Sequence, residues 1–449
     1  MNLYSLLQAR KNNNNPVRVG VIGAGKFSSM FLSQARLVPG LQVTGIAELD
    51  PDRAFQALAR TGWDPEAAVG AESTRAINDS AAAGKVAITT EAAQLIHAEC
   101  DVIMEITGNP EVGTEHAVAA IEADKHVVMV NVEADCLLGS ALASRARDRG
   151  VVYTMAYGDQ PALIAEQLDW ARTVGFEVVC AGKGTRYQPE YHYSTPETVW
   201  GYYGFSEERV ASGDYNAQMF NSFLDGSKSA IEMCAVANGS GLTPQPAGLQ
   251  FPAVGVSDLA EVLKPKSDGG ILEHSGTVEV VASEHRDGTP VHGDLRWGVY
   301  VVFRAPTPYV ERCFQEYGVK TDSSGRYSAL YRPYHYIGLE LGISVASVAL
   351  RGEPTGVSRE FIADVAAYAK RDLQAGDQLD GEGGYTVFGR LVTAVESVAS
   401  HALPLGLTGK ATMVRPVSKG CILSYDDVRL DSSSLAYALR KDMEAQLKK

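Results

Sequence analysis

The sequence has few cysteines, no long apolar run and no excess of basic residues. Its six cysteines among 449 residues form no C-x-x-C pair, which argues against a disulfide framework and a thiolate zinc site. No stretch approaches ~18 consecutive apolar residues, so we expect no membrane span. Lys and Arg number 40 against 54 Asp and Glu, and this acidic balance predicts no nucleic-acid partner. The N-terminus lacks the apolar segment and cleavage site of a secretory signal, so we expect a cytoplasmic protein with reduced thiols.

Short apolar segments alternate with segments of helical periodicity over the first third of the chain. This alternation predicts an α/β fold with a parallel sheet of βαβ units, the architecture of a Rossmann domain. The expected strands are 17–23, 41–47, 101–106, 126–130 and 151–156, and the expected helices are 28–37, 52–60, 90–98, 111–123 and 134–149. Residues 61–85 interrupt the pattern and are expected to form an insertion beside the sheet. We place this first domain at 1–157.

The pattern changes after Tyr157, and the chain length predicts roughly three domains. Residues 158–360 are expected to form an α+β catalytic domain with helices 161–175 and 228–238 and strands 177–182, 217–224, 276–284 and 295–304. The apolar segment 333–350 is expected to form a helix buried between domains or subunits, which predicts a homo-oligomer. Residues 361–449 contain short strands and glycine turns, and they predict a small β-rich domain.

A glycine loop follows the first expected strand and opens the next helix. It reads Gly23-x-Gly25-x-x-Ser28, with Lys26 and Phe27 between the second glycine and the serine. The first glycine allows a tight turn, the second lets a pyrophosphate approach the backbone, and the small Ser28 permits close packing of helix on strand. The helix N-terminus supplies N–H groups to the phosphates. The loop therefore predicts a dinucleotide site, and its alternative is a βα turn that binds nothing.

Polar residues at the ends of other strands extend this predicted cofactor site. Glu48 ends the second strand, where a carboxylate accepts hydrogen bonds from the adenosine ribose and favours NAD over NADP, although the nearby Arg53 could reverse that choice. Ligands of such sheets lie at the carboxyl ends of the strands. We therefore expect Thr107, Gly108, Asn109, Asn131 and Glu133 to contact the nicotinamide half of NAD or NADP. Glu133 and Asp135 are alternatively explained as carboxylates at the start of a helix.

At this point the chain resembles the homoserine-dehydrogenase-like oxidoreductases, and more narrowly the deoxyxylulose-phosphate-reductoisomerase-like (DRL) branch. The resemblance is carried by GVIGAGKF, EITGNPEVGTEHA, HVVMVNVEADCLLG, EVVCAGKGT, FLDGSKSAIEMCAVANGSGL and LYRPYHYIGLE. The stretches AKRDLQAGDQL and RPVSKGCILSYDDV resemble a SAF domain, a small β-clip module. The resemblance implies reduction of a small sugar phosphate or sugar acid with NAD(P), coupled in DRL enzymes to a skeletal rearrangement. Homoserine dehydrogenases carry Asn-Lys where this chain has Asn131-Val132-Glu133, which argues against homoserine as substrate.

The second domain must supply a proton for the reacting carbonyl. Lys183 lies between two glycines that we expect to let a ligand approach closely. Asp225, Lys228 and Glu232 form a second group, in which Lys228 and Glu232 are i,i+4 neighbours on one helix face. We favour Lys228 as the proton donor, with Glu232 as an acid/base or as a ligand of a divalent metal. The alternatives are a lysine in a surface turn and a capped helix with a surface ion pair.

The stretch YRPYH adds Arg332, which could clamp a phosphate or carboxylate, and His335, which could shuttle a proton. An aromatic interface rich in hydrogen bonds explains both residues equally well. The predicted function is an NAD(P)-dependent oxidoreductase acting on a small sugar phosphate or sugar acid. A plain dehydrogenase of a hydroxy acid or a homoserine-like substrate is the alternative within enzymes. A dinucleotide sensor and a SAF-type assembly factor are the alternatives of another class.

Overall fold

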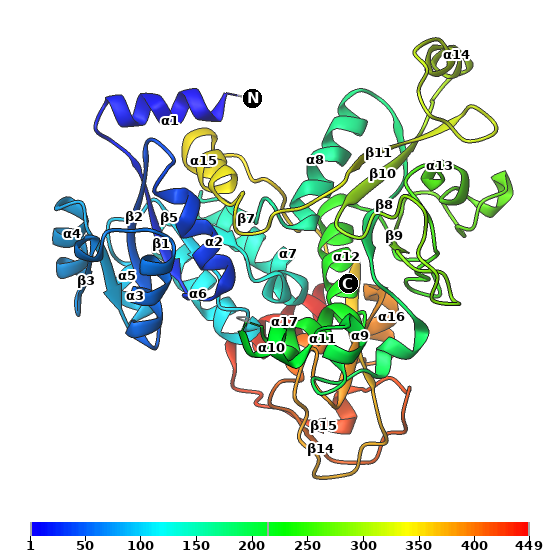
Figure 1. Ribbon diagram of the computed structural model, residues 1–449. Coiled ribbons are helices and arrows are strands. Elements are labelled where there is room, and N and C mark those ends of the chain that lie inside the picture. Colours follow the sequence, from blue (N-terminus) through cyan, green and yellow to red (C-terminus); the bar gives the residue numbers. More distant parts are fainter. Residues whose placement is uncertain (1, 213–214, 448–449) are drawn as a thin grey trace. The chain divides into compact units, whose positions relative to one another are not determined.

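The computed structural model describes residues 2–212 and 215–447, shown in Figure 1. The chain divides into two units, Met1–Ala162 with Tyr336–Arg359 and Leu163–His335 with Glu360–Lys449. The expected division at 157 and 360 into three domains stays a prediction. None of the helices in these described residues is long and apolar enough to cross a membrane.

In the described part of the first unit, seven parallel strands form the predicted Rossmann-type sheet, in the order β3-β4-β2-β1-β5-β6-β7. Except in the edge strand β3, where Val69 is exposed, most of their apolar side chains are buried on both faces, as is typical of parallel sheets. The strands are β1 (Val17–Ile22), β2 (Leu41–Ala47), β3 (Ala68–Gly70), β4 (Val86–Thr89), β5 (Val102–Glu105), β6 (His126–Met129) and β7 (Tyr153–Met155). The expectation of an insertion at 61–85 is wrong, because residues 68–70 are the edge strand and residues 74–82 a helix of the same alternation.

Helices connect these strands, and two further helices of the unit come from distant parts of the sequence. The connecting helices are α2 (Lys26–Ala35), α3 (Pro51–Arg60), α4 (Thr74–Ala82), α5 (Ala92–Ile96), α6 (Pro110–Glu122) and α7 (Val132–Asp148). Helix α1 (Leu3–Asn12) lies beside α15 (Gly342–Arg351), blue against yellow in Figure 1. The predicted helix 333–350 is therefore too long. It starts only at Gly342, and its apolar face joins the core of the Rossmann sheet.

The second unit contains a four-stranded mixed sheet within its described residues, in the order β11-β10-β8-β9. Its strands are β8 (Glu177–Thr185), β9 (Thr277–Ala282), β10 (Val299–Arg304) and β11 (Tyr327–Arg332). Its helices are α9 (Val199–Tyr203), α10 (Glu207–Ser212), α11 (Ala217–Leu224), α12 (Ser227–Ser240), α13 (Leu259–Val262) and α14 (Pro308–Glu316), while α8 (Gln160–Thr173) leads into the unit. The strand expected at 217–224 is instead α11, whose first turn is capped by the Asn216 side chain accepting from Met219 N.

The C-terminal segment of the second unit is rich in short strands. It contains β12 (Ala363–Ala369) paired with β13 (Val387–Thr393), β14 (Thr412–Met413) paired with β15 (Val428–Arg429), and the helices α16 (Ala394–Ala399) and α17 (Leu435–Leu447). This agrees with the expected β-rich composition of the segment. Its assignment as a SAF-like β-clip stays a prediction.

Candidate active site

The glycine loop is tightly packed at its first glycine and open at its second. Gly23 lies at φ +106°, a conformation that L side chains rarely adopt, and a Cβ there would lie 3.1 Å from Ile106 O. Gly25 precedes the first turn of α2, and a Cβ on it would meet no atom within 4 Å. The open side of the loop therefore faces free space. Ser28 is fully buried, as expected for close packing of helix and strand, whereas Lys26 is exposed and Phe27 half-buried.

Glu48 lies next to the glycine loop. Its Oε2 accepts a hydrogen bond of 2.7 Å from Ala24 N, and its Oε1 lies 3.7 Å from Arg53 Nη1. The carboxylate is thus fixed at the end of β2, beside the turn between β1 and α2. The sequence spacing predicted this adjacency, and the residues fit the ribose half of a dinucleotide. The guanidinium of Arg53 balances part of the negative charge.

The residues expected near the nicotinamide lie at the carboxyl ends of β5 and β6. Thr107 Oγ1 donates to the buried Glu105 carboxylate at 2.5 Å. Asn131 Nδ2 donates to Asn109 O at 2.8 Å, so these two residues are brought together. Each also caps a helix: Asn109 Oδ1 accepts from two N–H groups at the start of α6, and Asn131 Oδ1 accepts from one at the start of α7. Gly108, at φ +75°, completes this loop.

Two carboxylates of the first turn of α7 differ in their surroundings. Glu133 is half-buried. Asp135 is buried and accepts hydrogen bonds from Tyr153 Oη at 2.9 Å and Ser358 Oγ at 2.8 Å. Burial raises the pKa of Asp135 to about 6, although these two hydrogen bonds favour its ionised form. Asp135 therefore ties α7 to β7 and to residue 358, which explains its presence better than a helix-dipole role alone.

In the second unit, Lys183 and Glu232 form a buried ion pair. Lys183 comes from β8 and Glu232 from the middle of α12, and their side chains are 7% and 3% exposed. No charged residue stands beside Lys183 in the sequence, and the fold provides one from a helix far along the chain. A buried ammonium beside a buried carboxylate is an arrangement suited to passing a proton.

The glycines beside Lys183 serve packing rather than ligand approach. A Cβ on Gly182 would lie 1.7 Å from Glu279 O, and one on Gly184 would lie 2.0 Å from Leu295 O. The expectation that they make room for a ligand is therefore wrong. They let neighbouring backbone come within contact distance of β8, and this holds the Lys183 backbone in place.

Asp225, Lys228 and Glu232, which the sequence placed in one group, have different partners in the structure. Asp225 pairs with Lys370 at 2.7 Å rather than standing in one group with Lys228 and Glu232. Its Oδ1 accepts from Ser227 N, the first residue of α12, at 2.8 Å, while the N-cap position itself is Gly226. Lys228 is half-buried in the first turn of that helix.

Positive charge lies at the end of the sheet that carries Lys183. Val299 on β10 pairs with both Lys183 and Arg332, so these two side chains lie on one face, two strands or about 10 Å apart. Arg296 was missed by the sequence reasoning. Its guanidinium lies 4.8 Å from the ring of Trp297, and in the described chain it has no carboxylate partner. An Arg-Trp pair directly before a strand was the available signal.

His335 follows β11, and its Nδ1 lies 2.8 Å from Trp297 O. The structure thus connects this histidine with the segment of Arg296. Among residues 2–212 and 215–447, no group of three or more His, Cys, Asp and Glu side chains is arranged to hold a metal ion.

Comparisons with known proteins agree with this geometry. Residues 20–155 match the family model of the homoserine dehydrogenase NAD binding domain, and residues 158–341 match that of the oxidoreductase DRL catalytic domain. No curated protein matches the chain. Both family resemblances expected from the sequence are therefore confirmed, whereas neither family model extends into the expected SAF domain.

Solved structures similar to the chain are dehydrogenases and reductases. A probable dehydrogenase from Thermotoga maritima is 14% identical over 76% of this chain and 91% of its own, with a TM-score of 0.38. A putative oxidoreductase from Bacillus subtilis is 12% identical with the same coverage and a TM-score of 0.37. A myo-inositol dehydrogenase from Lactobacillus casei, solved with NAD(H) and myo-inositol, is 17% identical over 41% of this chain, with a TM-score of 0.27. The match spans half the length of that last chain.

The two family matches and the glycine loop define the class of protein: it is an NAD(P)-dependent oxidoreductase. Residues 158–341 resemble the catalytic domain of the DRL oxidoreductases. The match to a catalytic domain supports the enzyme over the sensor and the assembly factor that the sequence left open.

Proposed function

We propose that the protein transfers a hydride between NAD(P) and the carbonyl or hydroxyl group of a small anionic substrate, a sugar phosphate or a sugar acid. The observation that carries the proposal is the buried Lys183–Glu232 pair, at the end of a sheet where Arg296 and Arg332 supply positive charge. Bound nicotinamide supplies the hydride chemistry, and the side chains of this protein supply proton transfer and orientation.

Lys183 is proposed as the proton donor. Reduction of a carbonyl leaves an alkoxide, and Lys183 Nζ gives that oxygen a proton; in the oxidative direction Nζ takes the proton back. Glu232 holds the ammonium in one orientation. We favour Lys183 over Lys228 because its partner is buried with it, so its position is determined by β8 and α12 together. His335 remains the next candidate.

Cofactor choice is proposed to rest on Glu48. Its carboxylate would accept hydrogen bonds from the adenosine ribose and repel a 2′-phosphate, so NAD should bind better than NADP. The hydrogen bond from Ala24 N supports this placement, because it holds the carboxylate beside the pyrophosphate loop. Thr107, Asn109 and Asn131 are proposed to shape the nicotinamide end.

The anionic group of the substrate is proposed to bind the guanidinium groups. Arginine offers two parallel N–H donors that match a phosphate or a carboxylate. A rearrangement of the carbon skeleton before reduction, as in DRL enzymes, is a second candidate activity, and the match of residues 158–341 favours it.

A substrate panel tests the proposal. Purified protein is mixed with NADH or NADPH and a set of sugar phosphates, sugar acids, hydroxy acids and homoserine, and nicotinamide absorbance is followed. We expect turnover with an anionic sugar and a ~10²–10⁴-fold loss of rate in Lys183→Met. The exposed Lys320→Met is the matched control and should keep its rate. Turnover with neutral sugars only, or an unchanged rate in Lys183→Met, would contradict the proposal.

A further inference from the structure

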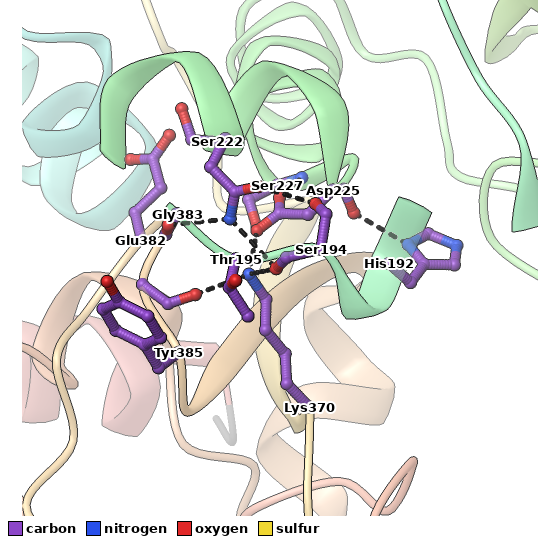
Figure 2. A network of polar contacts seen from close by, with 12 residues as sticks. His192, Ser194, Thr195, Ser222, Asp225, Ser227, Lys370, Glu382, Gly383 and Tyr385 are labelled. Carbon is purple, nitrogen blue, oxygen red and sulfur yellow. Dashed lines mark hydrogen bonds and ion pairs between the residues drawn. The ribbon is translucent and has the colours of Figure 1, made fainter. Parts of the chain in front are cut away.

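Lys370, which follows β12, is a buried cation with a complete set of partners. Its Nζ donates to Ser194 O at 2.8 Å and Gly384 O at 2.7 Å, and it pairs with Asp225 Oδ2 at 2.7 Å. Figure 2 shows its side chain extending toward Ser194 and Asp225. The three protons of an ammonium group thus have three acceptors. A lysine buried in this way costs desolvation and is tolerated only with such partners.

Asp225 connects Lys370 to α12, the helix that carries Glu232. It lies between α11 and α12, and its second carboxylate oxygen accepts from Ser227 N at the start of α12. Its carbonyl accepts from His192 Nδ1 at 2.7 Å. Glu232, the partner of Lys183, lies in the second turn of the same helix. The position of Asp225 therefore determines where α12 begins.

The C-terminal segment holds α12 at both ends. Gly389 N, on β13, donates to Ser227 Oγ at 2.8 Å. Near the other end, Asn238 Oδ1 accepts from Ile362 N and Ala363 N, each at 2.8 Å. These contacts come from residues beyond 341, where the match to the catalytic domain model ends.

We infer that the C-terminal segment holds α12 in the position that the Lys183–Glu232 pair requires. Lys370 is a positioning residue for this pair and acts through Asp225 and α12. The inference rests on the proposed function, because it takes the Lys183–Glu232 pair as the site of proton transfer. Removing the ammonium leaves Asp225 buried without its counter-charge. The first turn of α12 must then move or admit water, and Glu232 moves with it.

The test compares Lys370→Met with Lys370→Arg, the double variant Asp225→Asn/Lys370→Met and the exposed control Lys410→Met. Amide hydrogen exchange over residues 227–232 reports the start of α12 without any substrate. Single-turnover reduction reports the chemical step, and titration with the dinucleotide reports cofactor binding. The double variant removes both charges, so it remains informative where Lys370→Met folds poorly.

Lys370→Met should speed amide exchange at 227–232 by at least tenfold and slow reduction by ~10²-fold, since displacements of about 1 Å have such effects. Dinucleotide affinity should stay unchanged, because the glycine loop belongs to the first unit. Lys370→Arg and the double variant should recover slow exchange in part, and Lys410→Met should resemble the wild type.

Two outcomes of the exchange measurement would overturn the inference. In the first, Lys370→Met folds and its amide exchange at 227–232 is unchanged. In the second, Lys370→Met folds poorly and the double variant exchanges just as fast. Unchanged reduction in Lys370→Met while Lys183→Met is impaired would also overturn the inference. If Lys183→Met itself keeps its rate, the proposed donor is wrong, and faster exchange in Lys370→Met would still support the role of Lys370 in placing α12.

Discussion

Glu279, on β9, is a buried carboxyl group whose ionisation should weaken the fold near neutral pH. Its Oε1 accepts from Gln250 N at 3.0 Å, Phe251 N at 3.3 Å and Val280 N at 2.9 Å. Among the described residues no cation pairs with it, and burial raises its pKa from the ordinary 4.5 to about 7, against the opposing effect of these three N–H groups.

The linkage between proton binding and folding gives the direction and the size of this change in the free energy of unfolding. The folded state binds this proton more tightly than the unfolded chain, so the stability it contributes is fully present below pH 4.5 and is lost as the pH rises through about 7. At about 1.4 kcal/mol for each pKa unit, the rise from 4.5 to about 7 corresponds to ~3 kcal/mol of unfolding free energy.

Urea unfolding from about pH 5 to about pH 8 measures this effect in the wild type and in Glu279→Gln. Glutamine keeps a carbonyl oxygen for the three N–H groups and does not titrate. The difference in free energy of unfolding between the variant and the wild type should therefore grow, in favour of the variant, by up to ~3 kcal/mol from the lower to the upper end of this pH range. The exposed Glu316→Gln is the control and should follow the wild type. Parallel curves for wild type and Glu279→Gln would refute the reasoning.

Three further predictions concern the cofactor and the chemistry. Gly25→Val should abolish dinucleotide binding in a folded protein, because its side chain would fill the space left open at the loop; calorimetric titration measures this, and unchanged affinity would remove the proposed site. NAD should bind better than NADP, and Glu48→Ser should narrow the gap; a wild type that prefers NADP would show that Arg53 or another cation reads the phosphate. Lys183→Met should lower single-turnover reduction ~10²–10⁴-fold and Lys228→Met much less; the reverse order would restore Lys228 as the donor.

The Rossmann half of the chain was predictable because its signals are local. A buried strand, a glycine loop and a helix follow one another within about a dozen residues, and each constrains the next. The contact of Glu48 with Ala24 N follows directly, because adjacent parallel strands end at the same edge of the sheet. The error at 61–85 has the same origin: the edge strand Ala68–Gly70 is only three residues long, too short to give a periodic pattern.

The second unit was harder because its decisive contacts are distant in sequence. The prediction of a strand at 217–224 is wrong, because Phe220, Phe223 and Leu224 recur at helical spacing behind the capping Asn216. The segment 333–350 was taken for one helix, although Pro333 and Gly338 delay its start to Gly342. In both cases capping and breaking residues were better guides than composition.

Local spacing alone gives little information on which lysine acts in the site, and the choice between Lys183 and Lys228 stays a proposal. An i,i+4 pair such as Lys228 and Glu232 contributes only ~0.3–0.5 kcal/mol on a helix surface, so its spacing carries little information about function. Burial is the stronger constraint. A carboxylate that stays ionised at the centre of a domain is stabilised by a counter-charge buried with it, and the fold brings Lys183 on β8 to Glu232 and Lys370, just after β12, to Asp225. Buried pairs of this kind are fixed by the whole fold, which is also what suits them to hold a reacting proton in one place.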